Sequence, residues 1–318
     1  MPDEHNDDLW RNFPKTALEF EKRFATEADC RAYWIEARWG GTPSCAKCGS
    51  TRVWPERGGT LFECAACGHQ TSLTSGTALQ GTRKPFKMWF RAVFEISSRR
   101  NGISAKDLQR IMGFGSYETA WTWLHKLRAA LVRPGREPLA QRVQIDEGFV
   151  GGTRGGKSMV LVATETTDGR VRLAHADNND EATLEQFAHE HVASAAAVTT
   201  DGLASYNSKS LGARPHQGIV QTKAERRVHD TLQGVHWTIS LLKRWLLGTH
   251  AGAVKPKHLQ AYLDEFAFRH NRRKTNGVGR IAARVIESLV AHAPMPMRAL
   301  VDATVRSRWF ASIQPQSA

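Results

Sequence analysis

Two pairs of cysteines constrain the fold of this chain more than any other feature. Cys45 and Cys48 form one C-x-x-C pair, and Cys64 and Cys67 form a second pair after 15 intervening residues. A glycine follows each pair, which suits a tight turn that aims two sulfurs at one point. Four thiolates at this spacing are typical of a structural Zn²⁺ site, because four protein ligands leave no open position for chemistry. The spacing predicts a zinc ribbon over residues 41–81.

Disulfides or a redox pair are the alternative uses of these four cysteines. Both are disfavoured, because the first residues carry no signal-peptide pattern and the chain lacks a secretory context. The fifth cysteine, Cys30, has no partner in the sequence, and we expect it to be a buried apolar residue. Hydrophobic residues make up 41% of the chain without any run of about 18, which predicts a globular, cytoplasmic protein outside the membrane.

The positive charge is concentrated in one segment. The 318-residue chain has a formal net charge of +13, and residues 82–136 alone hold 12 basic and 3 acidic side chains. Residues 1–40, expected to be a helical segment, hold 6 basic and 9 acidic side chains. A local excess of this size predicts double-stranded DNA as the partner, while a solvated basic face is the simpler alternative.

The basic segment also has the pattern of three short helices. Apolar residues at helical spacing predict a first helix after Pro85, and Ser104 and Ser116 are N-cap residues for the second and third. Gly113 separates the last two, which predicts a helix-turn-helix, with a plain three-helix bundle as the alternative. In a helix-turn-helix the last helix enters the major groove. There we expect it to expose Tyr117, Thr119, Thr122, His125 and Lys126.

Beyond Pro138 the pattern changes to that of an α/β domain. Strands are predicted over 142–150, 158–164, 170–176, 197–200 and 218–220, and helices over 180–191 and 228–247. Three strands, a helix, a strand, a helix, a strand and a helix is the order of an RNase H-like domain, which we assign to residues 137–275. Residues 276–318 are expected to be a C-terminal helical tail, so the whole chain is predicted to be a multidomain α+β protein.

Two aspartates lie where this domain has little structural use for an acid. Asp146 is inside the first strand and Asp201 directly follows the fourth. These strands are neighbours in the predicted topology, so the two carboxylates converge and repel unless a cation lies between them. Mg²⁺ ions held in this way activate the attacking oxygen and stabilise the leaving oxygen of a phosphoryl transfer. An ion pair for Asp146 and a turn cap for Asp201 are the alternatives, and Glu147 is excluded as a ligand because it should face the other side of the strand.

These residues carry a family resemblance. The chain resembles the DDE-type transposases of bacterial insertion sequences that have an N-terminal zinc ribbon. The matching stretches are Ile-Asp-Glu-Gly-Phe-Val-Gly-Gly (145–152), Thr-Asp-Gly-Leu-Ala-Ser-Tyr (200–206), Leu-Leu-Lys-Arg (241–244) and residues 257–273. The resemblance implies RNase H-like architecture, Mg²⁺ dependence, binding of terminal inverted repeats, and strand transfer into target DNA. It also implies a homo-oligomer on DNA, associated with the bacterial nucleoid.

One position departs from the family pattern. The resemblance implies a third acidic residue about 35 positions after the second aspartate, and a Lys or Arg seven residues later on the same helix face. Those positions hold His236 and Lys243. We expect His236 to be the third ligand, with Mn²⁺ tolerated better than Mg²⁺ because it accepts nitrogen more readily, and Lys243 to contact a phosphate. A structural histidine is the alternative, with Asp230 as the nearest acidic residue.

The remaining predictions concern DNA contacts and the choice of function. A basic cluster is expected to follow the DNA backbone through Arg269, Arg272 and Arg273. A non-catalytic DNA-binding regulator derived from a transposase would use residues 41–136 alone, and a simple RNase H-like nuclease would cleave without strand transfer. The presence of both Asp146 and Asp201 favours an enzyme over the regulator.

Overall fold

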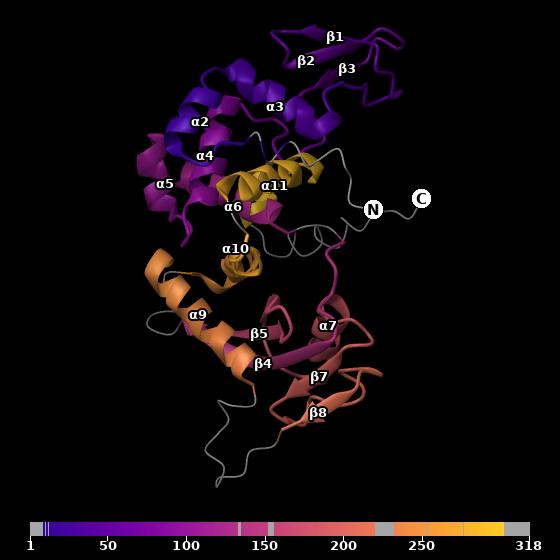
Figure 1. Cartoon of the computed structure of the whole chain (residues 1–318), viewed down its shortest axis with the longest axis vertical. Helices are drawn as coiled ribbons and strands as arrows, with labels where there is room; N and C mark the ends of the chain where they lie inside the picture. The colour runs from indigo at the N-terminus through magenta and orange to yellow at the C-terminus, as the bar shows by residue number, and fades with distance from the viewer. Residues whose placement is uncertain are drawn as a thin grey trace. The chain divides into compact units, whose positions relative to one another are not determined.

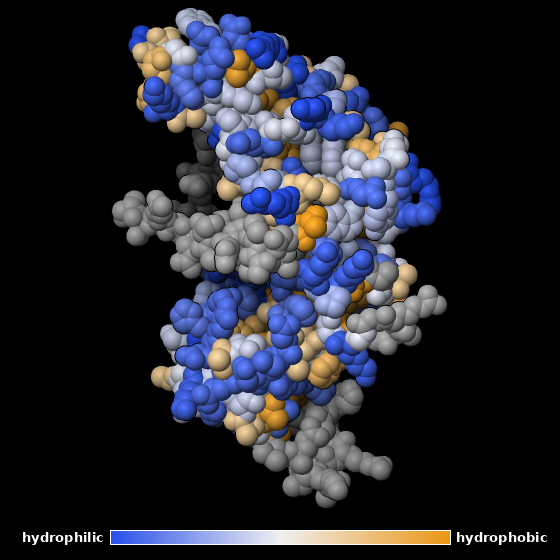
Figure 2. Space-filling model, turned by 180° about the vertical axis from the view of Figure 1, so that it is seen from behind, coloured by the Kyte–Doolittle hydropathy of each residue, from blue (hydrophilic) through white to orange (hydrophobic). Residues whose placement is uncertain are grey.

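The chain forms two compact units, which are labelled by element in Figure 1. The computed structural model describes residues 9, 11, 13–132, 135–151, 156–219, 232–252, 254–275 and 277–301. The first unit comprises residues 1–134 and 275–318, and the second comprises residues 135–274. Among the described helices, none is both long enough and apolar enough to cross a membrane. On the face drawn in Figure 2, hydrophilic residues predominate and hydrophobic ones are scattered among them.

The first unit joins a small sheet to a set of helices. Its sheet is antiparallel, in the order β1 (Val53–Glu56), β2 (Leu61–Cys64) and β3 (Gln70–Ser72). Its helices are α2 (Ala17–Arg23), α3 (Glu27–Trp39), α4 (Phe86–Ser98), α5 (Ala105–Met112), α6 (Tyr117–Ala130), α11 (Val278–Ala291) and α12 (Met297–Val301). Aromatic rings from α2, α3 and α4 pack against one another in its core, where Cys30 is fully buried as predicted.

The three helices predicted for the basic segment are α4, α5 and α6. Pro85 precedes α4, and the side chains of Ser104 and Ser116 accept amide hydrogens at the starts of α5 and α6. Gly113 ends α5 with a φ of 65°, a left-handed conformation that glycine adopts without a Cβ penalty. Helices α5 and α6 pack against each other across this turn, in the order of a helix-turn-helix, and α11 and α12 pack against α6.

The second unit is built on a five-stranded mixed sheet. The strands lie in the order β6 (Val171–Ala176), β5 (Lys157–Glu165), β4 (Arg142–Gly151), β7 (Ala197–Thr200) and β8 (His216–Gly218). The first three are antiparallel to one another, and β7 and β8 run parallel to β4 and to each other. The predicted neighbourhood of the first and fourth strands is therefore confirmed, and the order is consistent with the RNase H-like fold.

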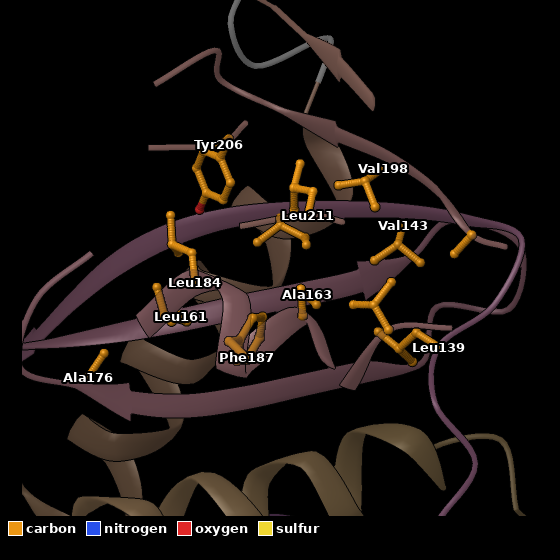
Figure 3. Packing of buried hydrophobic residues seen from close by; sticks show 14 residues of the cluster. Leu139, Val143, Leu161, Ala163, Ala176, Leu184, Phe187, Val198, Tyr206 and Leu211 are labelled. Carbon is orange, nitrogen blue, oxygen red and sulfur yellow. The ribbon is translucent and has the colours of Figure 1, made fainter. Parts of the chain in front are cut away.

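Helices cover both faces of this sheet. Helix α7 (Glu181–His191) packs on one face, while α9 (Gln233–His250) and α10 (Leu259–Asn271), which follows the 3₁₀ turn η2 (Pro256–His258), pack on the other. Side chains alternate along β4, so Val143 and Ile145 enter the α7 core and Val150 enters the α9 core. Figure 3 shows the α7 core, in which Phe187 of α7 and Tyr206 of the loop after β7 are buried.

Candidate metal and active sites

The four cysteines of the ribbon meet at one point. The Cys45 and Cys67 sulfurs are 3.7 Å apart, and the Cys48 and Cys64 sulfurs are 3.5 Å apart. Four sulfurs at a Zn–S distance of about 2.3 Å in a tetrahedron lie about 3.8 Å from one another. The described geometry therefore fits one tetrahedral metal ion held by all four thiolates.

Backbone amides donate hydrogen bonds to two of these sulfurs. The amide N–H groups of Lys47 and Ala66 donate to the sulfurs of Cys45 and Cys64, each at 3.4 Å. Partial burial disfavours the thiolate of Cys45, but the hydrogen bonds outweigh it and lower the pKa of this thiol to about 6. The two knuckles have matching turns, in which Gly49 and Gly68 adopt φ values of 71° and 67°. Hydrogen bonds likewise lower the pKa of Cys64 against the effect of burial, whereas the pKa of Cys48 is raised because the Cys67 and Cys64 sulfurs outweigh an amide hydrogen bond. The thiolate form, which is the form that binds metal, is thus favoured at Cys45 and Cys64.

The predicted aspartates also come together, in the second unit. Strand β7 pairs in parallel with the start of β4, Val143 opposite Val198 and Gln144 opposite Thr199, so the same register continued would bring Asp146 opposite Asp201. One carboxylate oxygen of each lies within 4.8 Å of the other. Asp201 also forms the predicted turn cap, because its Oδ1 accepts the amide hydrogen of Leu203 at 3.1 Å.

Glu147 belongs to the same cluster, so the expectation that it faces away from the two aspartates was wrong. An oxygen of Glu147 lies within 4.8 Å of those of Asp146 and Asp201. The alternation argument holds only where a neighbouring strand separates the two faces of a sheet. Strand β7 ends at Thr200, so the edge of β4 is open beside residues 146 and 147 and side chains from both faces can bend around it. The register of β7 against β4 decides that this edge is open, and the predicted strand bounds did not include that register.

His236 lies beside the cluster without being a member of it. Its Nε2 is 3.0 Å from Oδ2 of Asp146. It is not among the three residues, Asp146, Glu147 and Asp201, whose oxygens lie within 4.8 Å of one another. The alternative residue, Asp230, falls outside the residues that the structure describes.

Two glycines let α9 approach β4 closely at this point. A Cβ atom on Gly148 of β4 would lie 3.1 Å from two side-chain atoms of Ile239, and one on Gly234 of α9 would lie 2.9 Å from Oε1 of Gln144. The same Gln144 oxygen accepts the amide hydrogens of Gly234 and Val235 at the start of α9. The absence of side chains at these contacts allows the imidazole of His236 to reach Asp146.

The electrostatics of the cluster favour a bound cation. Burial raises the pKa of Asp146, and the nearby charge of Asp201 adds to this effect. Burial also raises the pKa of Glu147, against the hydrogen bonds it receives from Tyr206 and Asn179. Three carboxylates in a partly buried site are costly when all are ionised, unless a divalent ion lies between them. Their all-oxygen donor set fits such an ion.

Two members of the cluster, Asp146 and Glu147, line a cleft with a volume of about 720 Å³, together with His236. Two lysines, Lys157 of β5 and Lys243 of α9, line the same cleft, and both side chains are exposed. Phe149 and Leu247, which are 47% and 68% exposed, add apolar surface to its wall. Acidic, basic and apolar side chains within one cleft suit a substrate that carries phosphates and bases.

Comparisons with known proteins assign the chain to a family. A family model described as the ISXO2-like transposase domain matches residues 138–271, and one described as the transposase zinc-ribbon domain matches residues 25–70. Together they match more than half of the chain. The chain belongs to the DDE-type insertion-sequence transposase family. Its zinc ribbon and its acidic cluster are thus the metal-binding parts of a DNA-binding transposase fold.

No curated protein matches the chain. Among solved structures, the chain is similar to one from a cryo-electron microscopy structure of the simian T-cell lymphotropic virus intasome in complex with the PP2A regulatory subunit B56 gamma. The similarity covers 50% of this chain and 67% of that chain, with 14% sequence identity and a TM-score of 0.31.

The proposed DNA-reading face of α6 differs from the sequence expectation. The prediction that His125 is exposed was wrong, because its side chain is 1% exposed and its ring packs on Trp121, with centroids 3.9 Å apart. Lys126 is half-buried, and desolvation lowers its pKa. Thr122 contacts Sδ of Met297 on α12, at 2.9 Å. Helices α11 and α12 pack against α6, and sequence patterns did not predict that the C-terminal segment returns to it.

Two residues remain at the start of α6. Tyr117 is 47% exposed, and Thr119 is half-buried with its hydroxyl 3.0 Å from that of Ser116. Tyr117 is therefore the one member of the expected set that α6 presents openly to solvent among its described residues.

The arginines at the end of α10 contact other groups of the second unit. Arg269 forms a 2.7 Å ion pair with Glu265, a fully buried carboxylate. Arg272 lies over the ring of Phe268, with 4.0 Å between its guanidinium carbon and the ring centroid. Arg273 donates to the backbone oxygens of Gly169 and His270. These contacts give the three arginines structural roles that the DNA-backbone prediction did not include.

Proposed function

We propose that this protein is an active transposase that binds the terminal inverted repeats of an insertion sequence, cleaves DNA at its ends and joins the freed 3′ hydroxyl to target DNA. The observation that carries the proposal is the carboxylate cluster of Asp146, Glu147 and Asp201 within the matched transposase domain, where Asp146 and Glu147 line a cleft. A DNA-binding regulator without catalysis would have no use for three converging, partly buried acids.

The residues around the cleft would have different roles, namely metal binding and phosphate binding. The carboxylates of Asp146 and Asp201 would hold Mg²⁺ or Mn²⁺, which supply activation of the attacking oxygen and stabilisation of the leaving oxygen in phosphoryl transfer. Lys243 and Lys157 would bind the phosphates on either side of the scissile bond, and their charges offset the repulsion between the acidic cluster and DNA. His236, whose Nε2 lies 3.0 Å from Oδ2 of Asp146, would be the third ligand that the spacing predicts.

The first unit would supply recognition of the element ends. Its metal would be structural Zn²⁺, because four cysteines occupy every tetrahedral position. The basic segment that contains α4, α5 and α6 would contact the terminal repeats, with Tyr117 at the exposed start of α6. We further propose that the transposase acts as a homo-oligomer on DNA in the cytoplasm, at the nucleoid.

A cleavage and strand-transfer assay tests the proposal. Purified protein is incubated with labelled DNA carrying the element's own ends, a target plasmid, and Mg²⁺ or Mn²⁺. We expect Asp146→Asn and Asp201→Asn to reduce cleavage by about 10³-fold or more, since each keeps the shape but loses a charge that holds the metal, an effect of several kcal/mol. Glu185→Gln, an exposed acid on α7, is the matched control and should retain full activity.

The possible outcomes separate the candidate functions. Wild-type protein that binds terminal DNA but does not cleave it with either Mg²⁺ or Mn²⁺ would favour the non-catalytic regulator. Cleavage without joined products would favour the simple nuclease. Near-normal cleavage by either asparagine variant would contradict the assignment of the site.

DNA binding is tested separately by fluorescence anisotropy across salt concentrations. We expect affinity to fall steeply with salt, because phosphate contacts release counterions, and Tyr117→Ala to weaken binding roughly tenfold at unchanged Tm. His125→Ala, a change at a buried position on the same helix, should instead lower Tm. Equal affinity of Tyr117→Ala and wild type would remove the start of α6 from the interface.

A further inference from the structure

We propose that the second unit binds unpaired DNA bases beside its carboxylate cluster, and that Trp237 is the side chain on which a base next to the scissile phosphate stacks. The inference rests on the proposed function and deepens it. It names the form of DNA that the site takes, which is an end whose base pairs are opened at the position of cleavage.

The first step is the distribution of exposed apolar side chains. In the described part of the second unit, the large apolar side chains that are more than a third exposed are Phe149, Leu203, Trp237 and Leu247. We call these four residues the apolar rim. A single exposed apolar residue needs no explanation, but a group of them around one site marks a binding surface.

Three members of the apolar rim lie beside the cluster or in its cleft. Phe149 is two residues beyond Glu147 and shares its face of β4, and it lines the cleft together with Leu247. The amide of Leu203 donates to Oδ1 of Asp201 at 3.1 Å. The apolar rim therefore borders the acids from β4, from the loop after β7 and from α9.

The fourth member, Trp237, is the largest and directly follows His236 on α9. Its side chain is 60% exposed, and Ser240, one turn later, lines the cleft, so Trp237 stands at the edge of the cleft. Among the described residues, its indole takes part in no hydrogen bond, ion pair or ring contact. Trp245 of the same helix differs, because its ring packs 5.9 Å from that of Phe266. Trp237 thus offers an open aromatic face next to the site.

The occupant of the apolar rim follows from the charges around it. Lys157 and Lys243 line the same cleft, and Arg244 is exposed seven residues after Trp237, on the same face of α9. Basic and apolar side chains together suit a partner that is both anionic and aromatic. A paired duplex keeps the faces of its bases stacked inside the helix, whereas an unpaired strand offers them to side chains. An unpaired DNA strand therefore fits this surface better than a duplex does.

The two forms of DNA make different use of Trp237. In a paired end, a base reaches the indole only after its pair has opened, so stacking stabilises the opened state more than the closed complex. In an end that is already unpaired, the base is stacked before the reaction starts. Stacking then stabilises the bound DNA and the transition state equally, and does not change the rate at saturation.

Single-turnover cleavage with saturating, zinc-loaded full-length protein and Mg²⁺ tests the inference. The element's own end is used in two versions, one fully paired and one with two mismatched pairs at the cleavage position. We expect Trp237→Ala to slow cleavage of the paired end by about 10–100-fold, because stacking of one base is lost, and that of the mismatched end by less than about threefold.

Two control variants accompany this measurement. Trp237→Phe keeps an aromatic face and should stay within about threefold of wild type on both DNAs. Leu18→Ala removes an apolar side chain that is 85% exposed on α2, and should leave both rates unchanged. An equal loss on both DNAs in Trp237→Ala, or no loss on either, would overturn the inference. An equal loss together with a changed sedimentation coefficient would assign the apolar rim to a second copy of the chain instead.

Binding without cleavage separates this inference from the proposed function. By fluorescence anisotropy without divalent ions, wild-type protein should bind the mismatched end about tenfold more tightly than the paired end, and Trp237→Ala should lose most of that preference. Protein that shows the preference but never cleaves either end would refute the transposase activity and leave the base-binding surface intact. Protein that cleaves both ends, with Trp237→Ala acting equally on them, would refute only the base-binding surface.

Discussion

The two metal sites of this protein are assembled in opposite ways. The ribbon takes four identical ligands from two short turns within 23 residues, and amide hydrogen bonds favour the charged form of Cys45 and Cys64. The acidic site takes its carboxylates from β4 and from a loop more than 50 residues later, and burial disfavours the charged form of Asp146 and Glu147. The first site is closed by its own ligands, whereas the second lies in a cleft.

The difference explains what each site can do. The free energy of metal binding to a closed set of four thiolates contributes directly to the folding of a small sheet that has little core of its own. An open set of carboxylates that repel one another gains most from a cation when substrate oxygens complete the coordination. The four-cysteine site is therefore suited to stabilising the ribbon, and the carboxylate cluster is suited to binding a substrate together with a metal ion.

The largest expected effect separates the two sites by substitution. Cys48→Ser should reduce the zinc content from about one ion per chain to none and expose the ribbon to proteolysis, because metal binding and folding are coupled there. Mn²⁺ affinity at the acidic site should be unchanged. Zinc content is measured by mass spectrometry, and Cys30→Ala, at a cysteine outside the ribbon, is the control that should keep its zinc. Loss of Mn²⁺ binding in Cys48→Ser would mean that the sites are not independent.

A smaller effect is expected from closing the gap between β4 and α9. Gly148→Ala places a methyl group against Ile239 and should cost about 1–3 kcal/mol in the free energy of unfolding, with a parallel loss of cleavage as His236 moves from Asp146. Chemical denaturation measures the first quantity. The double variant with Ile239→Ala should lose less stability than the sum of the single changes, because the second change makes room for the methyl group. Strict additivity would argue against this contact.

The smallest effect concerns pH and sharpens the electrostatic contrast. Because burial raises the pKa values of Asp146 and Glu147 in the folded state, the metal-free fold is favoured below their ordinary carboxyl pKa and loses stability as pH rises through the raised values. Mn²⁺ offsets this loss only when the acids are ionised. We expect the rise in Tm on adding Mn²⁺ to be greater at pH 8 than at pH 5 by roughly 2–4 °C. An equal rise at both values would contradict the argument.

Much of the fold could be predicted because its signals are local. Ser104, Ser116 and Asp180 cap helices that begin where the sequence predicted, and the fourth strand has the predicted bounds, Ala197–Thr200. The convergence of Asp146 and Asp201 followed from strand order, which the sheet confirms. These features depend on hydrogen bonds and periodicity within a few residues, or on one topological rule.

The features that were missed depend on how distant elements are aligned and on what covers them. Glu147 joins the cluster because β7 pairs only with the start of β4, and the pattern along α6 could not reveal that His125 is buried on a helix covered by α11 and α12. The closeness of α9 to β4 depends on Gly148 and Gly234, because a side chain at either position would collide with a residue of the other element. Each is a property of two segments distant in sequence, so neither segment alone carries the signal.

The division of the first unit between residues 1–134 and 275–318 has a consequence for biosynthesis. Helix α11 contributes Leu289, whose carbonyl accepts the amide hydrogen of Ala78, and His292 donates to the carbonyl of Val132. On the ribosome, the N-terminal part of this unit is made first but must wait for some 140 residues before its last helices emerge. The whole second unit is synthesised in the interval, so the fold of the transposase domain can be complete before that of the first unit is. A nascent chain can therefore assemble its acidic cluster before the last helices of the unit that carries the zinc ribbon have emerged.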